Sequence, residues 1–249
     1  MKLVQSILTK NPCYTAGRKI TVKGLMLHSV GCPQPKASVF IKNWNSPSYD
    51  SACVHGFIDG NDGTVYQTLP WNHRGWHCGS GSKGSGNNTH IGVEMCEPAC
   101  IKYTSGANFT CSDTATARTV AKRTYEAAVE LFAYLCKQYN LNPIADGVII
   151  SHREGHSRGI ASNHGDPEHL WNGLGMGYTM DGFRKDVKAA MDGSGVSEPE
   201  EGGWYRVRKS WADAKSQKGA FKVLANARKC VDENPGYSVY DESGKAVYS

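Results

Sequence analysis

The chain has 249 residues, of which 39% are hydrophobic and 20% charged, and it carries a formal net charge of +5. This length and composition suffice for one main domain with a sizeable core and one small additional module. Every apolar run is far shorter than the roughly 18 residues of a membrane span, and neither a membrane nor a nucleic acid is a predicted partner.

Strand and helix patterns are interspersed through the first 191 residues, which predicts an α/β domain with a mixed central β-sheet flanked by helices. An Asp-Gly turn at residues 62–63 joins two of the strand patterns into a predicted hairpin. The longest helix pattern places one apolar stripe along residues 114–138. In chain order, strands are expected at 20–28, 54–59, 64–69, 91–95 and 148–151, and helices at 35–44, 114–138 and 183–191.

Two histidines stand at the ends of predicted buried strands. His28 closes the run Ile20–Leu27, and His152 follows Val148–Ser151. Such histidines project from the rim of a sheet, where a mononuclear metal site can form. With Asp166 they make two imidazoles and one carboxylate, a set that leaves the fourth position of tetrahedral zinc open for water. One interpretation is that these residues form a catalytic zinc site. The alternative is that each histidine is only a hydrogen-bonded residue at the end of a strand.

A change of composition divides the chain near residue 192. Residues 192–203 lack aromatic residues and are rich in Gly, Ser, Pro and acidic residues, which predicts a flexible linker. Residues 204–249 contain nine basic and five acidic residues. They are expected to form a small α+β domain of β-α-β type, with strands at 204–208 and 237–241, a helix at 219–230 and a further strand at 245–248.

Nine cysteines are an unusually high and odd number, and no C-x-x-C pair occurs among them. A zinc ribbon and a thioredoxin-type motif are therefore not supported. Cys96, Cys100 and Cys111 are close enough in sequence for a disulfide or a second metal site, but free thiols are the expected state.

Six short motifs follow one another along the chain: Leu27-His28, Val54–Asp59 with Asp62–Val65, Gly75–Gly79, Ile91–Glu94, Ser151-His152 and His164–Pro167. Their order resembles that of the type-2 N-acetylmuramoyl-L-alanine amidases. These amidases are a zinc family related to phage lysozymes of the T7 kind and to peptidoglycan recognition proteins. The resemblance covers roughly residues 20–175. It implies a hydrolase that cuts the amide between the lactyl group of N-acetylmuramic acid and L-alanine of the stem peptide.

Mapped onto this sequence, the family's three Zn²⁺ ligands match His28, His152 and Asp166. The third position varies between Cys and Asp in the family, and no cysteine lies between His152 and the linker here. His164 stands two residues before Asp166, where the family places a donor. His164 is expected to stabilise the oxyanion, and as an alternative it replaces Asp166 as the third ligand.

Glu94 is the predicted general base. It ends an otherwise apolar strand, where burial would raise the pKa of its carboxyl toward a useful value. One branch of the family places a Tyr immediately before the His of a Tyr-His-Phe motif, but this chain has Val54 before His55. A rim glutamate in a salt bridge is the alternative. Trp76 and His77 match positions near the family's substrate groove and are predicted to bind or shape it.

These features together predict a modular peptidoglycan hydrolase, with a zinc amidase domain at 1–191, a linker at 192–203 and a wall-binding domain at 204–249. The tail resembles small glycan-binding modules of the SPOR kind and is expected to bind a cell-wall polymer. The first ten residues lack the features of a secretory signal. A phage or prophage endolysin of a Gram-positive host is therefore expected, made in the host cytoplasm and released through membrane holes formed by a holin. A bacterial autolysin or wall-recycling amidase, and a non-catalytic peptidoglycan receptor, are the alternatives.

Overall fold

The computed structural model describes residues 1–193, 204–221, 227–228, 230–231 and 233–248. Contacts divide the chain into two compact units, Met1–Ser194 and Gly195–Ser249, and each is treated by itself. Most of the predicted linker at 192–203 lies outside the described residues. Among those residues, no helix has the length and apolar character needed to cross a membrane.

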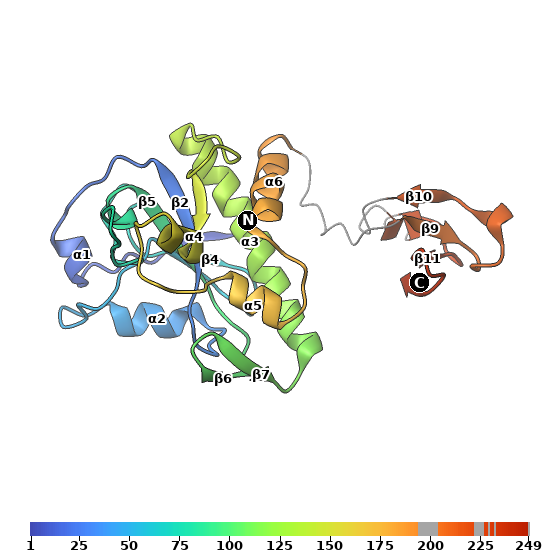
Figure 1. Ribbon diagram of the computed structural model, residues 1–249, viewed down its shortest axis with the longest axis horizontal. Coiled ribbons are helices and arrows are strands. Elements are labelled where there is room, and N and C mark those ends of the chain that lie inside the picture. Colours follow the sequence, from blue (N-terminus) through green and yellow to red (C-terminus); the bar gives the residue numbers. More distant parts are fainter. Residues whose placement is uncertain (194–203, 222–226, 229, 232, 249) are drawn as a thin grey trace. The chain divides into compact units, whose positions relative to one another are not determined.

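A mixed sheet forms the centre of the first unit (Figure 1). It has six strands in the order β1-β4-β3-β5-β2-β8. The strands β3, β5, β2 and β8 run parallel to one another, whereas β4 is antiparallel to β3 and parallel to β1. The predicted mixed α/β fold is thus confirmed. The strands are β1 (Leu3–Gln5), β2 (Gly24–Ser29), β3 (Gly56–Ile58), β4 (Val65–Gln67), β5 (His90–Met95) and β8 (Ile149–Ser151).

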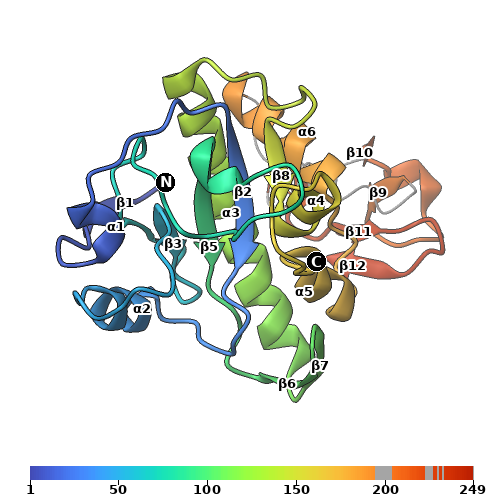
Figure 2. The same cartoon turned by 60° about the vertical axis from the view of Figure 1, so that its left-hand side comes forward.

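Helices cover the sheet on both sides. The long helix α3 (Thr114–Tyr139) contacts β3, β5 and the helix α6 (Met180–Met191), which also contacts β8 (Figures 1 and 2). The helix α2 (Ala37–Trp44) packs Phe40 and Trp44 against Phe57 of β3. Asp113 caps α3 by accepting a hydrogen bond from the Thr116 amide, and Asn140 ends it in a left-handed conformation.

The side chains of β2 alternate between the two faces of the sheet. Leu25 and Leu27 point to one face of the sheet, and Met26 and His28 point to the other. Met26 packs with Cys78, Ile150 and Ala161. His28, two residues further, is in register with Glu94 of β5. Because paired residues of neighbouring strands share a face, the side chains of His28 and Glu94 lie on the same face of the sheet, beyond the core residue Met26.

Several short elements lie outside the predicted set. They are the edge strand β1, α1 (Pro12–Thr15), the 3-10 helix η1 (Gly86–Asn88), the hairpin strands β6 (Ile101–Ser105) and β7 (Asn108–Cys111), α4 (His152–Ser157) and α5 (Glu168–Gly173). The helix α4 begins where the strand β8 ends, because Ser151 and Glu154 form a capping box. Glu154 also binds Arg184 of α6 at 2.9 Å, so a six-residue helix is held in place at its first turn.

The second unit contains a four-stranded antiparallel sheet, in the order β10-β9-β11-β12. Tyr205, Val207 and Val239 lie in its own small core, with Ala227 and Val231. The predicted helix at 219–230 is wrong at its start, since Gly219–Phe221 is a strand that pairs with β9. Residues 227, 228, 230 and 231 are helical. The strands are β9 (Tyr205–Arg208), β10 (Gly219–Phe221), β11 (Ser238–Tyr240) and β12 (Ala246–Tyr248), with a 3-10 helix η2 at Ala214–Ser216.

Candidate active site

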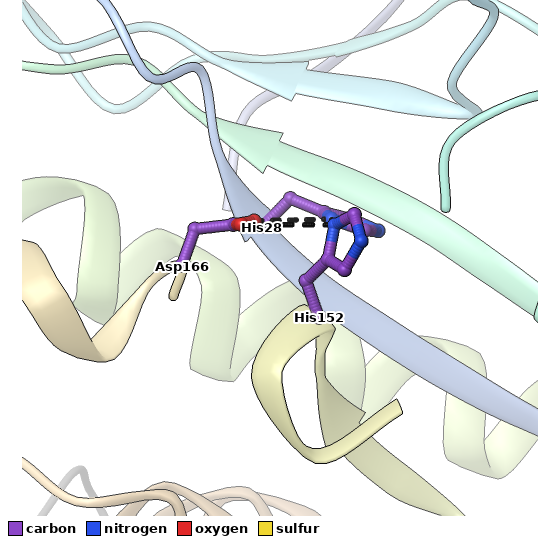
Figure 3. A group of neighbouring side chains, drawn as sticks. All are labelled: His28, His152 and Asp166. Carbon is purple, nitrogen blue, oxygen red and sulfur yellow. Dashed lines mark hydrogen bonds and ion pairs between the residues drawn. The ribbon is translucent and has the colours of Figure 1, made fainter. Parts of the chain in front are cut away.

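The three predicted metal ligands meet at one end of the sheet (Figure 3). His28 lies near the end of β2, and His152 is the first residue of α4, directly after the parallel neighbour β8. Asp166 lies in the segment between α4 and α5, where its carbonyl oxygen accepts a 3.4 Å hydrogen bond from the Arg153 amide. Parallel strands bring their carboxyl ends to one edge, so residues separated by more than a hundred positions become neighbours.

The donor atoms of this triad lie within 4.8 Å of one another, and the two histidines approach different oxygens of Asp166. His28 Nδ1 is 3.1 Å from His152 Nδ1 and 3.2 Å from Asp166 Oδ2, and His152 Nδ1 is 3.6 Å from Asp166 Oδ1. A tetrahedron with metal–ligand bonds of about 2.0–2.1 Å has edges of about 3.3–3.4 Å. Two imidazoles and one carboxylate are also ligands that zinc accepts. The residues therefore fit a zinc ion on both spacing and chemistry.

The electrostatic environment keeps His152 ready to bind a metal. Burial, followed by the nearby charge of His28, lowers the pKa of His152 to about 3. The imidazole is then neutral at physiological pH, which is the form that ligates. On the other side of the ring, His152 Nε2 lies 3.2 Å from Ser162 Oγ, which in turn lies 3.3 Å from the Cys78 carbonyl oxygen.

Glu94 lies beside the triad and lines the same cavity, which has a volume of about 710 Å³. Burial raises the pKa of Glu94 well above its usual range, and the charges of Asp166 and Glu97 add to the effect. Its Oε2 atom is buried and has no hydrogen-bond partner within the described part of the chain. No ion pair with Glu94 occurs there either, so its contacts favour the general-base prediction over the salt-bridge alternative.

His164 occupies a different position from the ligand atoms. Its Nδ1 lies 3.2 Å from His152 Nε2 and 3.1 Å from Ser162 Oγ, on the opposite side of the His152 ring from Nδ1. His164 also lines the cavity. The three atoms that converge belong to His28, His152 and Asp166, which favours Asp166 over His164 as third ligand.

The two predicted substrate-groove residues differ in their surroundings. Trp76 has 38% of its surface exposed, and its side chain is not part of the lining of the cavity in the described residues. His77 contributes to the lining but is 9% exposed, and its Nδ1 lies 3.0 Å from Nε2 of His28. The contact of His77 is thus with a candidate ligand, and its role toward substrate stays a prediction.

A second polar cluster, formed by Glu97, Tyr103 and His169, was not predicted from the sequence. Tyr103 of β6 donates to Glu97 Oε2 at 2.7 Å, and its oxygen lies 2.6 Å from His169 Nε2. Glu97 is fully buried and also accepts the Gly31 amide at 3.1 Å. Burial raises the pKa of Glu97 to about 7. Tyr103 and His169 line the cavity, and Glu97 could have been noticed because it is a second acid directly after an apolar strand.

All nine cysteines are free thiols, as expected. The Cys100 and Cys111 thiols are hydrogen-bonded neighbours at the base of the β6–β7 hairpin, and Cys13 contacts Cys53 in the same way. Cys96 is fully buried. None of the nine belongs to a group of metal-ligating side chains among the described residues.

The sequence profile of the N-acetylmuramoyl-L-alanine amidase family matches residues 17–169 of this chain. A curated relative, the N-acetylmuramoyl-L-alanine amidase CwlH of Bacillus subtilis, is 38% identical over 80 residues, which are 32% of this chain and 30% of CwlH. XlyA of the same organism is also 38% identical over 80 residues, 32% of this chain and 25% of XlyA. The match thus spans less than a third of the length of these curated relatives.

Solved structures show the same fold. The catalytic domain of XlyA superposes with a TM-score of 0.52 at 21% identity, covering 75% of this chain and 99% of that domain. The profile match includes His28, Glu94, His152 and Asp166 and extends over more than half of the chain. On this match, the chain belongs to the N-acetylmuramoyl-L-alanine amidase family.

Proposed function

We propose that the chain is a zinc-dependent peptidoglycan amidase that hydrolyses the bond between N-acetylmuramic acid and L-alanine of the stem peptide. The observation that carries the proposal is a donor triad next to Glu94, whose Oε2 atom is buried without a hydrogen-bond partner among the described residues. Glu94, His152 and Asp166 line one cavity. Family membership supports the same chemistry.

The cavity residues divide the reaction between them. Bound zinc would supply a Lewis acid that polarises the amide carbonyl and makes water more acidic. Glu94 accepts the proton of the attacking water, and later donates it to the nitrogen of the leaving alanine. Water thus delivers hydroxyl to the acyl carbon and hydrogen to the amine. His164, on the cavity wall beside His152, is proposed to donate to the developing oxyanion.

A peptidoglycan receptor that binds without cutting is the main alternative of another class. A receptor needs neither a complete donor triad nor a buried carboxylate beside it. The presence of both favours an enzyme.

Metal removal tests the zinc requirement. We expect dialysis against a chelator to abolish release of stem peptides from purified walls, and one equivalent of Zn²⁺ to restore it, because the Lewis acid and the acidified water are lost and regained together. The release of stem peptides should be measured by the appearance of new free amino groups. Full activity in protein shown by elemental analysis to be free of metal would contradict the zinc requirement.

The second unit is proposed to hold the enzyme on a cell-wall polymer. Its residues 204–249 contain nine basic and five acidic residues, and it has its own small core. Several cations lie against aromatic rings there. The Arg208 guanidinium is 5.0 Å from the Trp211 ring, and the Lys218 ammonium is 5.4 Å from the Tyr237 ring. Trp204 is 44% exposed, so a ring as well as positive charge is available to an anionic glycan.

Co-sedimentation with purified walls tests this binding. We expect the full chain to sediment with Gram-positive walls at low salt and to be released as salt rises, because screening weakens attraction between exposed charges. A shortened chain ending at residue 193 should remain mostly in the supernatant. Equal sedimentation of both proteins would contradict wall binding by the second unit. The proposed biology is that of a phage or prophage endolysin, and a bacterial autolysin of the same chemistry would be distinguished by genomic neighbours.

A further inference from the structure

His77 is a buried histidine whose ring lies against Gly92 of β5 and beside the ring of the candidate ligand His28. The two ring centroids are 5.1 Å apart, and the rings meet edge to face. Behind His77 lies a further buried histidine, His55, with a centroid separation of 5.8 Å. The backbone amide of His77 donates to Asn87 Oδ1 at 2.8 Å, so both backbone and ring of His77 have fixed partners.

The hydrogen-bond partners of His77 determine which ring nitrogens of His77 and His28 carry a hydrogen. His77 Nε2 lies 3.1 Å from the carbonyl oxygen of His90. A carbonyl only accepts, so His77 Nε2 carries the hydrogen and His77 Nδ1 keeps a lone pair in the neutral ring. That lone pair lies 3.0 Å from His28 Nε2, which must then donate. The remaining nitrogen of His28, Nδ1, is left with its lone pair toward the metal position.

Two glycines leave space for the His77 ring, and one of them lies inside a strand, where glycine reduces stability. A Cβ atom on Gly92 would come within 2.3 Å of His77 Cγ, and one on Gly75 would come within 3.2 Å of His77 Cδ2. Glycine in the interior of a strand weakens the strand, and often marks a close approach of another group. Gly92 lies in the middle of β5, so β5 has a glycine, which weakens the strand, at the position where the His77 ring packs against it.

A competing state explains why such support is needed. His28 Nδ1 is also 3.2 Å from Asp166 Oδ2. In the other neutral tautomer His28 would carry its proton on Nδ1 and donate it to this carboxylate, which blocks two candidate ligand atoms at once. An acceptor at His77 Nδ1 opposes that tautomer. The second candidate ligand has a comparable arrangement through Ser162, whose hydroxyl lies between His152 Nε2 and the Cys78 carbonyl.

We propose that His77 is a positioning residue, which holds His28 in the tautomer that presents Nδ1 to the metal. This inference rests on the proposed metal site, but the tautomer is a property of the metal-free protein and can be measured there. Metal-bound histidines generally donate their second N–H to a fixed acceptor, and loss of that acceptor costs about 10–100-fold in metal affinity.

Two amide variants separate the two hydrogen bonds of His77. In His77→Asn the amide oxygen lies near the former Nδ1 and keeps an acceptor for His28. In His77→Gln the amide group lies near the former Nε2, so it keeps the bond to the His90 carbonyl and loses the one to His28. Both variants retain a polar side chain, and both lose the imidazole. The matched control is His90→Gln, because the His90 ring bonds Thr89 and Gly147 instead of a candidate ligand.

The first measurement is the tautomer of His28, by long-range ¹H–¹⁵N correlation on the metal-free full chain. Wild type, His77→Asn and His90→Gln should show the hydrogen on Nε2, whereas His77→Gln should show the Nδ1–H form. The second is the Zn²⁺ dissociation constant, which should rise about 10–100-fold in His77→Gln only. Unchanged tautomer and affinity in His77→Gln would overturn the proposal, and so would equal losses in His90→Gln.

These two readouts also separate this inference from the proposed function. If the wild-type chain binds no zinc, the proposed metal site fails, while the tautomer comparison still decides the role of His77. If zinc binds and all four proteins share one His28 tautomer, the metal site stands and the positioning role fails. If Gln weakens zinc and Asn does not, both stand.

Discussion

Replacing Glu94 by Gln should abolish peptidoglycan hydrolysis and leave zinc binding intact. The amide cannot accept the proton of the attacking water, and general acid–base catalysis contributes about 10²–10⁴-fold to rate. Because Glu94 has no ion pair in the described structure and Oε2 has no hydrogen-bond partner there, loss of its charge should not destabilise the fold. The measurement is the release rate of stem peptides, together with zinc content by elemental analysis.

Glu97 provides a matched control three residues further along the chain. Its carboxylate is also buried, but it is bound to Tyr103 and to the Gly31 amide, and an amide oxygen can still accept one of these bonds. Glu97→Gln is therefore expected to retain most of the activity. A fully active Glu94→Gln protein would contradict the general-base assignment, as would equal losses in the two variants.

Replacing Asp166 by Ala should remove zinc. Two imidazoles would remain, and the loss in affinity should exceed the roughly 100-fold upper end of the cost of changes outside the ligand set. Zinc at 100 times its dissociation constant stabilises a native protein by about 2.7 kcal/mol. Wild type should therefore gain this stability on addition of zinc, and Asp166→Ala should gain little. Calorimetric melting with and without zinc measures the difference.

His164→Ala decides between the two candidates for the third ligand. Since His164 Nδ1 faces the Nε2 side of His152, its removal should leave zinc affinity near wild type and reduce the turnover rate. Removal of one oxyanion donor typically costs about 10²–10³-fold in rate. Zinc loss in His164→Ala with zinc retained in Asp166→Ala would reverse the ligand assignment.

Most of the sheet and the two candidate histidine ligands were predictable because local sequence patterns carry them. Buried parallel strands appear as apolar runs, and a histidine at the end of such a run stands out. His28 of β2 and His152 after β8 were predicted in this way, and Glu94 was predicted as the acid that ends an otherwise apolar strand. The structure adds that Glu94 is in register with His28.

The elements that were missed depend on other signals. The helix α4 was not expected because Gly155 and Gly159 favour a loop, yet the Ser151–Glu154 capping box and Arg184 stabilise its start. The hairpin β6–β7 has one apolar face, made by Ile101, Tyr103, Phe109 and Cys111. Each strand contributes only two of these residues, and so short an alternation is a weak strand signal. In the second unit, pairing with β9 makes Gly219–Phe221 a strand, which is a tertiary effect that overrides local helix preference.

Contacts between distant residues could not be predicted from a single sequence. His77 matched a family position near a groove, but its bond to His28 requires the folded arrangement of β2, β5 and the segment around Trp76. The Glu97, Tyr103 and His169 cluster likewise joins three separate segments. Residue type alone marks these side chains as polar, and only the fold shows which partners satisfy them.

Mass spectrometry of digested peptidoglycan tests the central claim most directly. Purified walls treated with the zinc-loaded protein should release stem peptides with a free amino group on L-alanine, and glycan strands that carry unsubstituted lactyl carboxyl groups. No new reducing sugar ends should form. New reducing ends without free alanine amines would identify a glycosidase and contradict the account.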